Sequence, residues 1–167
     1  MREAVIVSTA RTGIGRAFKG ALNHTRSPTL LGHAIAHAVQ RARVDAYAKA
    51  ARLRLTDHPD PQPGPREVLV RIHAAGLNQL DSKIRDGAFK PILPYKLPLI
   101  LGHDLAGVVE AVGAAVTGFA PGDAVFARPR DGRIGTLAER IAVDHDDLAL
   151  MPQTLTMAEA AGIPLVG

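Results

Sequence analysis

The stretch that decides the fold runs from Glu67 to Asp81 and reads EVLVRIHAAGLNQLD. Apolar and polar residues alternate over its first half, which places Val68, Val70 and Ile72 on one face of a strand. The glycine and asparagine that follow are turn residues, and a short helix is predicted near residues 82–86. The stretch therefore predicts a strand that leads through a turn into a helix.

Short β-rich runs follow, separated by glycine, proline and aspartate. Strands are predicted at residues 105–112, 123–127, 137–143 and 148–150. Gly107 lies inside the first of these runs, where glycine indicates a bulge or a close approach of two backbones. Thr156 and Glu159 have capping-box spacing and predict the start of a helix. The expected fold class is mainly β with short helices (α+β), arranged as a small barrel or sandwich.

Composition limits the possible functions. The chain has 167 residues, of which 47% are hydrophobic, enough for one domain with its own core. It has no cysteine, which excludes disulfides, thiolate catalysis and Cys-ligated zinc, and we expect a cytoplasmic protein. No apolar run reaches the roughly 18–20 residues that a membrane span needs, so no membrane partner is expected.

The net charge of +4 is unevenly distributed. Residues 1–54 hold ten Lys/Arg and two acids, whereas residues 55–167 hold ten Lys/Arg and fourteen acids. A basic nucleic-acid arm, a transit peptide and a junction of two segments would each produce such a split. Only six aromatic residues are present, which argues against nucleic acid as a partner. Residues 3–9 read as a strand, which argues against an amphipathic transit helix.

The chain opens on a glycine turn, VIVSTARTGIGRA (Val5–Ala17). Gly13 and Gly15 fit the dinucleotide fingerprint G-x-G-x-x-G, but Phe18 stands where the third glycine is needed. We therefore predict a strand and a glycine turn rather than a phosphate cradle.

A helix is predicted over residues 29–39. His33 and His37 are four residues apart on one helix face and could chelate a metal. No third ligand is evident, so a solvated histidine pair is favoured.

Residues 2–45, REAVIVSTARTGIGRAFKGALNHTRSPTLLGHAIAHAVQRARVD, resemble the amino-terminal strand, loop and first helix of thiolases, the acetyl-CoA acetyltransferases. Gly13 stands where that family usually has proline. The thiolase nucleophile is a cysteine, which this chain lacks, so the resemblance does not imply acyl transfer. A thiolase-like acyltransferase fragment remains a remote alternative.

Four ordered motifs within residues 49–167 resemble the amino-terminal, GroES-like domain of the medium-chain dehydrogenase/reductase superfamily. They are PDPQPGPREVLVRIHAAGLNQLDSKIRDG, LPLILGHDLAGVVEAVGAAVTGFAPGDAVFA, GRIGTLAERIAVDHDDLALMP and LTMAEAAGIPLVG. They are similar to the zinc-independent quinone oxidoreductase and enone reductase branch. The resemblance implies a GroES-like, partly open barrel after a strand-loop-helix segment. The implied divisions are a thiolase-like segment at 1–45, the GroES-like domain at 46–155 and the start of a linker helix at 156–167.

The same resemblance implies that Asn78 and Asp81 are catalytic, because they match the Asn-x-x-Asp that lines the cleft beside nicotinamide and substrate. Asn78 could donate from its amide to a substrate oxygen, and Asp81 could order the loop and a water. Lys83 departs from the tyrosine that is frequent in this branch. Taken without the resemblance, the two residues favour a simpler role as caps of the short helix.

The resemblance also implies that no metal is bound. Zinc alcohol dehydrogenases have a cysteine at the position of Asn78 and a His-Glu pair at the position of His103-Asp104. An amide is a poor zinc donor, and one histidine does not make a site. The four-cysteine lobe of the zinc enzymes is missing, and an ordinary turn occupies residues 128–132. The implied reaction is hydride transfer from NADPH to a small quinone or enone.

In the resembled family, the helix that begins near Thr156 leads into a Rossmann domain that binds NADPH. No G-x-G-x-x-G occurs in these 167 residues. We therefore expect a truncated reductase that is inactive alone, with unknown cofactor-binding residues apart from Asn78 at the border of the nicotinamide. The alternative is a non-catalytic module whose exposed interdomain face binds a partner or a second copy.

Asp45–Ala50 does not read as the first strand of the resembled family. The resembled family begins with a strand that pairs with the region of residues 52–55, and Asp45–Ala50 is too short and Ala-rich for that role. We expect Ala4–Val7 to fill this edge beside Leu53 and Leu55.

Overall fold

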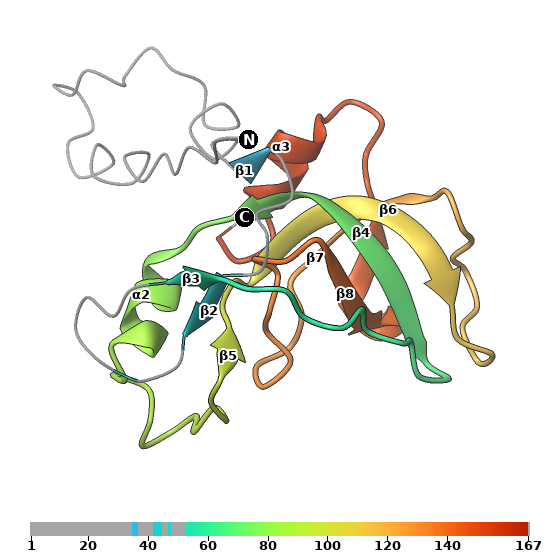
Figure 1. The fold of residues 1–167 in the computed structure, drawn as a ribbon. Helices are drawn as coiled ribbons and strands as arrows, with labels where there is room; N and C mark the ends of the chain where they lie inside the picture. Colours follow the sequence, from blue (N-terminus) through green and yellow to red (C-terminus); the bar gives the residue numbers. More distant parts are fainter. Residues whose placement is uncertain (1–34, 37–41, 45–46, 48–52, 167) are drawn as a thin grey trace, which may run out of the picture.

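The computed structural model describes residues 35–36, 42–44, 47 and 53–166, and a curved antiparallel sheet dominates them (Figure 1). The elements in chain order are β1 (Ile35–Ala36), β2 (Ala42–Val44), β3 (Arg54–Leu55), β4 (Glu67–Gly76), α2 (Gln79–Arg85), β5 (Leu99–Ile100), β6 (Asp104–Val112), β7 (Ala124–Ala127), β8 (Arg140–Asp144), the 3₁₀ helix η1 (His145–Asp147), β9 (Leu148–Leu150) and α3 (Met157–Ala161). Among these residues, no helix has both the length and the apolar character that crossing a membrane requires.

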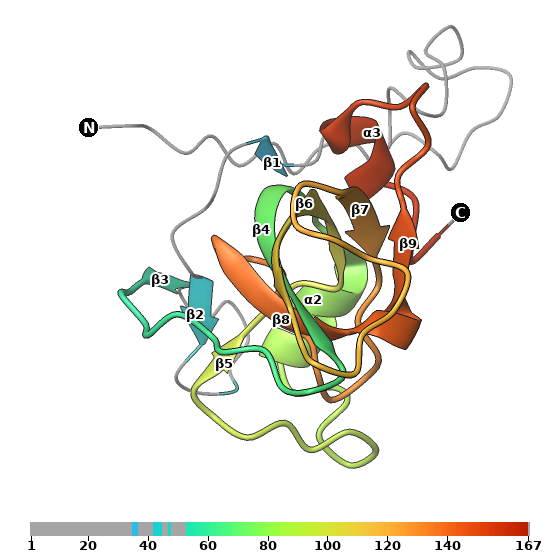
Figure 2. The ribbon, with the colours of Figure 1, turned by 90° about the vertical axis from the view of Figure 1, so that its right-hand side faces the viewer.

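β4 is the strand around which the larger sheet is organised. The six strands follow the order β1-β4-β6-β7-β9, and β8 also pairs with β4. β4 pairs with β6 along most of its length, with β8 at its beginning and with β1 at its end. β4, β6, β7 and β8 curve around a common interior (Figure 2). The expected mainly-β fold with short helices is confirmed.

The alternation in β4 produces the core face that the sequence predicts. Val68 and Val70 are 0% exposed and Ile72 is 4% exposed. They pack with side chains from β6, β7 and β8, among them Leu105 and Val125. Each fully buried side chain of this kind contributes about 1.5–3 kcal/mol relative to an exposed one.

Gly107 confirms the predicted close approach of two backbones. It is paired with Ile72 in the sheet, next to a shift in the β4–β6 register. A Cβ atom at Gly107 would lie 2.2 Å from the carbonyl oxygen of Arg71, so a side chain cannot be accommodated there.

A second, three-stranded sheet has the order β3-β2-β5. The strand beside Arg54–Leu55 is therefore Ala42–Val44, which was not predicted and ends directly before Asp45–Ala50. Three residues are too few to show a hydrophobic period, and pairing needs only an extended backbone. Ala4–Val7, which we expected at this edge, lies outside the described residues.

The predicted helix over residues 29–39 is wrong at Ile35–Ala36, which form β1 against Ala74–Ala75 at the end of β4. Pairing with an available strand edge outweighs local helix propensity there. His33 and His37 lie outside the described residues, as do the opening glycine turn and most of the thiolase-like segment.

Candidate functional site

Asn78 and Asp81 lie where β4 turns into α2. Asn78 is the N-cap residue of α2, with an extended backbone (φ −119°, ψ 153°), and Asp81 is the third residue of the helix. The backbone N–H of Asn78 donates to Asp81 Oδ2 at 2.7 Å. The capping role is therefore confirmed, because the carboxylate satisfies an N–H group at the helix start. Both residues are nearly buried, at 6% and 4% exposure.

His103, directly before β6, and Asp104, the first residue of β6, hydrogen-bond to these two side chains from the strand next to β4. The sheet pairs Asp104 with Gly76, which brings it next to the end of β4. Asn78 Nδ2 donates to Asp104 Oδ2 at 2.7 Å, and His103 Nδ1 lies 2.7 Å from Asp81 Oδ1. An ionised carboxylate only accepts, so Nδ1 is the donor.

The sequence does not predict this pairing, because the family resemblance relates His103 and Asp104 only to zinc. The available signal was the polar pair at the start of a predicted strand, directly after Gly102. Nothing in the sequence indicated that each of the two would bind one member of the Asn-x-x-Asp.

Two glycines allow the backbone to bring the four residues together. Gly102 has φ +107°, a left-handed conformation that side chains disfavour. A Cβ at Gly76 would lie 2.5 Å from the carbonyl oxygen of Ala161 in α3 and 3.0 Å from Asp104 Cβ. α3 packs closely over this end of β4 and β6, where Ala74, Ala106, Ala160 and Ala161 form a small apolar cluster. Thr156 accepts from the Glu159 N–H, as the predicted capping box requires.

Two buried polar atoms beside this group have no hydrogen-bond partner in the described part of the chain. One is His103 Nε2 and the other is Thr136 Oγ1, and both residues are 0% exposed. Buried polar atoms are nearly always satisfied by protein, water or ligand.

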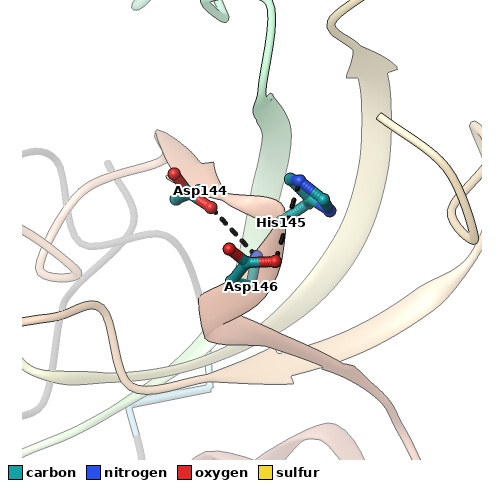
Figure 3. A group of neighbouring side chains, drawn as sticks. All are labelled: Asp144, His145 and Asp146. Atoms are coloured by element: carbon teal, nitrogen blue, oxygen red, sulfur yellow. Dashed lines mark hydrogen bonds and ion pairs between the residues drawn. The ribbon is translucent and has the colours of Figure 1, made fainter. Parts of the chain in front are cut away.

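A separate cluster, Asp144, His145 and Asp146, has three possible metal ligands within 4.8 Å of one another (Figure 3). This cluster was not predicted from the sequence. Arg66 contacts Asp146 at 2.6 Å, and Arg66 and Arg130 approach Asp144 at 3.7 and 3.5 Å. The backbone N–H of Asp146 and, secondarily, these arginines lower the pKa of Asp144. The carboxylates therefore already have cationic partners, as in a surface ion-pair network.

This cluster is the only such group found among the described residues. The ligand atoms of Asp81, His103 and Asp104 do not converge to that extent. They are instead used in hydrogen bonds within the group of four.

Residues 64–153 match the family described as "Alcohol dehydrogenase GroES-like domain". The chain is 39% identical over 130 residues to the chloroplastic quinone-oxidoreductase QR1 of Triphysaria versicolor, covering 77% of this chain and 40% of that protein. It is 42% identical over 105 residues to the chloroplastic NADPH-dependent alkenal/one oxidoreductase of Arabidopsis thaliana, covering 59% and 27%. The chain thus spans well under half the length of these relatives.

Solved structures show the same fold. An alcohol dehydrogenase superfamily protein from Novosphingobium aromaticivorans superimposes with a TM-score of 0.69 at 45% identity, covering 75% of this chain and 38% of that one. The Escherichia coli quinone oxidoreductase, solved with NADPH, superimposes with a TM-score of 0.66 at 26% identity, covering 72% and 36%.

Proposed function

This chain belongs to the alcohol dehydrogenase GroES-like domain family, within the medium-chain dehydrogenase/reductase superfamily, and we propose that it serves the zinc-independent, NADPH-linked reduction of a quinone or an enone. Relatives named as quinone, alkenal/one and 2-methylene-furan-3-one reductases support this substrate class. We assign residues 46–155 to the substrate-side domain and residues 156–167 to the start of a linker helix.

The buried group of Asn78, Asp81, His103 and Asp104 carries the proposal. In it, Asn78 borders the substrate and polarises the acceptor oxygen, and Asp104 fixes the direction of the amide by accepting from Nδ2. Asp81 orders the loop, since its two oxygens contact the Asn78 backbone and His103. A nicotinamide, when bound, supplies the hydride, and the protein supplies orientation and polarisation.

Zinc independence is supported by the chemistry of the donor set. Asn78 presents an amide, and it is engaged with Asp104 at 2.7 Å. A catalytic zinc needs three convergent protein ligands and an open position. Asp81, His103 and Asp104 bond to neighbouring groups instead of converging on one point.

The described residues do not fit the diphosphate of NADPH. A diphosphate site of this kind needs a glycine turn between a parallel strand and a helix N-terminus. The strand pairs in the described part of the chain are all antiparallel, and the Asp81 carboxylate occupies the start of α2. We therefore propose that only the nicotinamide end of NADPH lies beside Asn78. The diphosphate would bind outside the described residues of this chain.

A chimera tests the proposal. The full chain is joined after Gly167 to the cofactor domain of the Escherichia coli relative, and NADPH oxidation is followed with a quinone and with an enone. We expect turnover by the chimera, and a loss of about tenfold or more in kcat/KM for Asn78→Ala. Ser82→Ala, at an exposed position of α2, is the matched control and should leave the rate unchanged. A folded chimera without turnover, or equal rates for the two variants, would contradict the proposal.

A further inference from the structure

His103 has one ring nitrogen in a hydrogen bond and one buried nitrogen without a partner among the described residues. Its side chain is 0% exposed, and Nδ1 donates to Asp81 Oδ1 at 2.7 Å. In the neutral ring, a proton on Nδ1 leaves Nε2 as an acceptor. Nε2 has no hydrogen-bond partner among the described residues. The hydrogen bond to Asp81 thus fixes the tautomer of His103, and Nε2 is left as a buried acceptor.

Thr136 brings a second polar atom to the residue next to His103. The segment after Ile134 pairs with Gly102, whose carbonyl oxygen accepts from the Gly135 N–H at 3.0 Å. A Cβ atom at Gly102 would lie 2.3 Å from Thr136 Oγ1, so the hydroxyl lies against the Gly102 backbone. Within the described chain, this hydroxyl also has no partner.

Leaving such atoms unsatisfied is costly, and native proteins usually fill the place with water or ligand. A hydroxyl can donate to a carbonyl oxygen, whereas an unprotonated ring nitrogen can accept from an alcohol or phenol. His103 Nε2 and Thr136 Oγ1 could therefore hydrogen-bond to a substrate oxygen that is a carbonyl in the oxidised state and a hydroxyl in the reduced state.

We infer that His103 Nε2 and Thr136 Oγ1 form a subsite for the reacting oxygen of the substrate, with Asp81 as the positioning residue that sets the His103 tautomer. The inference rests on the proposed function and extends it by naming two groups, besides Asn78, that contact this oxygen. In the oxidised substrate the carbonyl accepts from Thr136, and in the hydroquinone the hydroxyl donates to His103. A bound water offers the same O–H chemistry, so the test must separate the two.

The first measurement is NMR of the His103 ring nitrogens in the intact chain, without cofactor. We expect the Nδ1–H tautomer, and a shift toward the Nε2–H tautomer in Asp81→Asn. Adding hydroquinone should move the Nε2 resonance, whereas its dimethyl ether, which has no O–H donor, should not. Wild-type chain showing the Nε2–H tautomer would overturn the inference without any variant.

The second measurement is calorimetric affinity for the quinone and for the hydroquinone. Thr136→Val keeps the side-chain shape and should weaken quinone binding about tenfold, the loss expected for one buried hydrogen bond to the carbonyl. The exposed Thr117→Val is the matched control and should bind as wild type does. Equal affinity for hydroquinone and its dimethyl ether would mean that water occupies the place, and the subsite would be rejected.

The two proposals fail separately. Quinone binding that Thr136→Val weakens, together with an inactive chimera, would support the subsite and contradict the proposed reductase function. An active chimera whose quinone affinity is unchanged by Thr136→Val would support the reductase function and contradict the subsite.

Discussion

Asn78 donates from Nδ2 to Asp104 Oδ2 at 2.7 Å, although 26 residues separate them in the chain. The contact joins the N-cap of α2 to the first residue of β6, and both residues are buried. It exists because β4 and β6 are paired so that Asp104 lies opposite Gly76. The start of α2 is therefore tied to the start of β6 by a charge-assisted hydrogen bond.

Replacing the Asn78 amide by a carboxylate should make the free energy of unfolding strongly pH-dependent. In Asn78→Asp, two buried carboxyl groups would face each other and share a proton, which raises the folded-state pKa of the pair. Stability is then retained at low pH and lost as pH rises through that value. Chemical denaturation of the variant and wild type at several pH values measures the difference.

Asn78→Ala is the matched comparison, with a loss of about 1–3 kcal/mol that should not grow toward neutral pH. If the Asp and Ala variants lost the same stability at every pH, the contact between Asn78 and Asp104 would not exist in solution.

Gly107→Ala should disrupt the β4–β6 pair. Its Cβ would lie 2.2 Å from the Arg71 carbonyl oxygen, which is a backbone atom that cannot rotate away. We expect a loss of about 3 kcal/mol or more, measured by urea unfolding. Gly118→Ala is the control, because Gly118 has φ +86° but no atom within 4 Å of the added Cβ. Conformational strain alone should cost it about 1–2 kcal/mol, and an equal loss for both variants would contradict the close approach.

His73 should make the chain less stable in mildly acidic solution. Burial and, secondarily, the charge of Arg71 lower its pKa in the folded state. As pH falls below about 6.5, the unfolded chain takes up a proton that the folded chain does not, so stability decreases until the folded-state pKa is passed. His73→Gln should flatten this part of the stability profile, whereas the exposed His58→Gln should not. An unchanged slope in His73→Gln would refute the assignment.

The cap of α3 should likewise contribute stability that is lost on acidification, but in a lower pH range than His73. The backbone N–H and then the hydroxyl of Thr156 lower the pKa of Glu159. This contribution is present above the ordinary glutamate pKa and is lost as pH falls through the lowered value. Glu159→Gln should reduce the acid sensitivity of thermal unfolding, with the exposed Asp57→Asn as control. Thr156→Ala should cost about 1 kcal/mol at neutral pH. An acid profile that Glu159→Gln leaves unchanged would contradict this cap.

Much of the large sheet could be predicted because its strands are long enough to show a period. The alternation at Val68, Val70 and Ile72 indicated the buried face, and Gly107 indicated the backbone contact. Helix α2 begins at Gln79 rather than near residue 82, and β8 covers Arg140–Asp144 rather than 137–143. Such boundaries depend on which backbone groups find partners, which a local pattern does not record.

The sequence alone determined that this chain builds a mainly-β domain with an Asn-x-x-Asp at the end of its leading strand, because side-chain periodicity and turn chemistry are local properties. Only the tertiary structure decided what those two residues contact. Pairing of β4 with β6 brings His103 and Asp104 to Asp81 and Asn78 across separations of 22 and 26 residues. Contacts of that range follow from strand register, which is a property of the whole sheet.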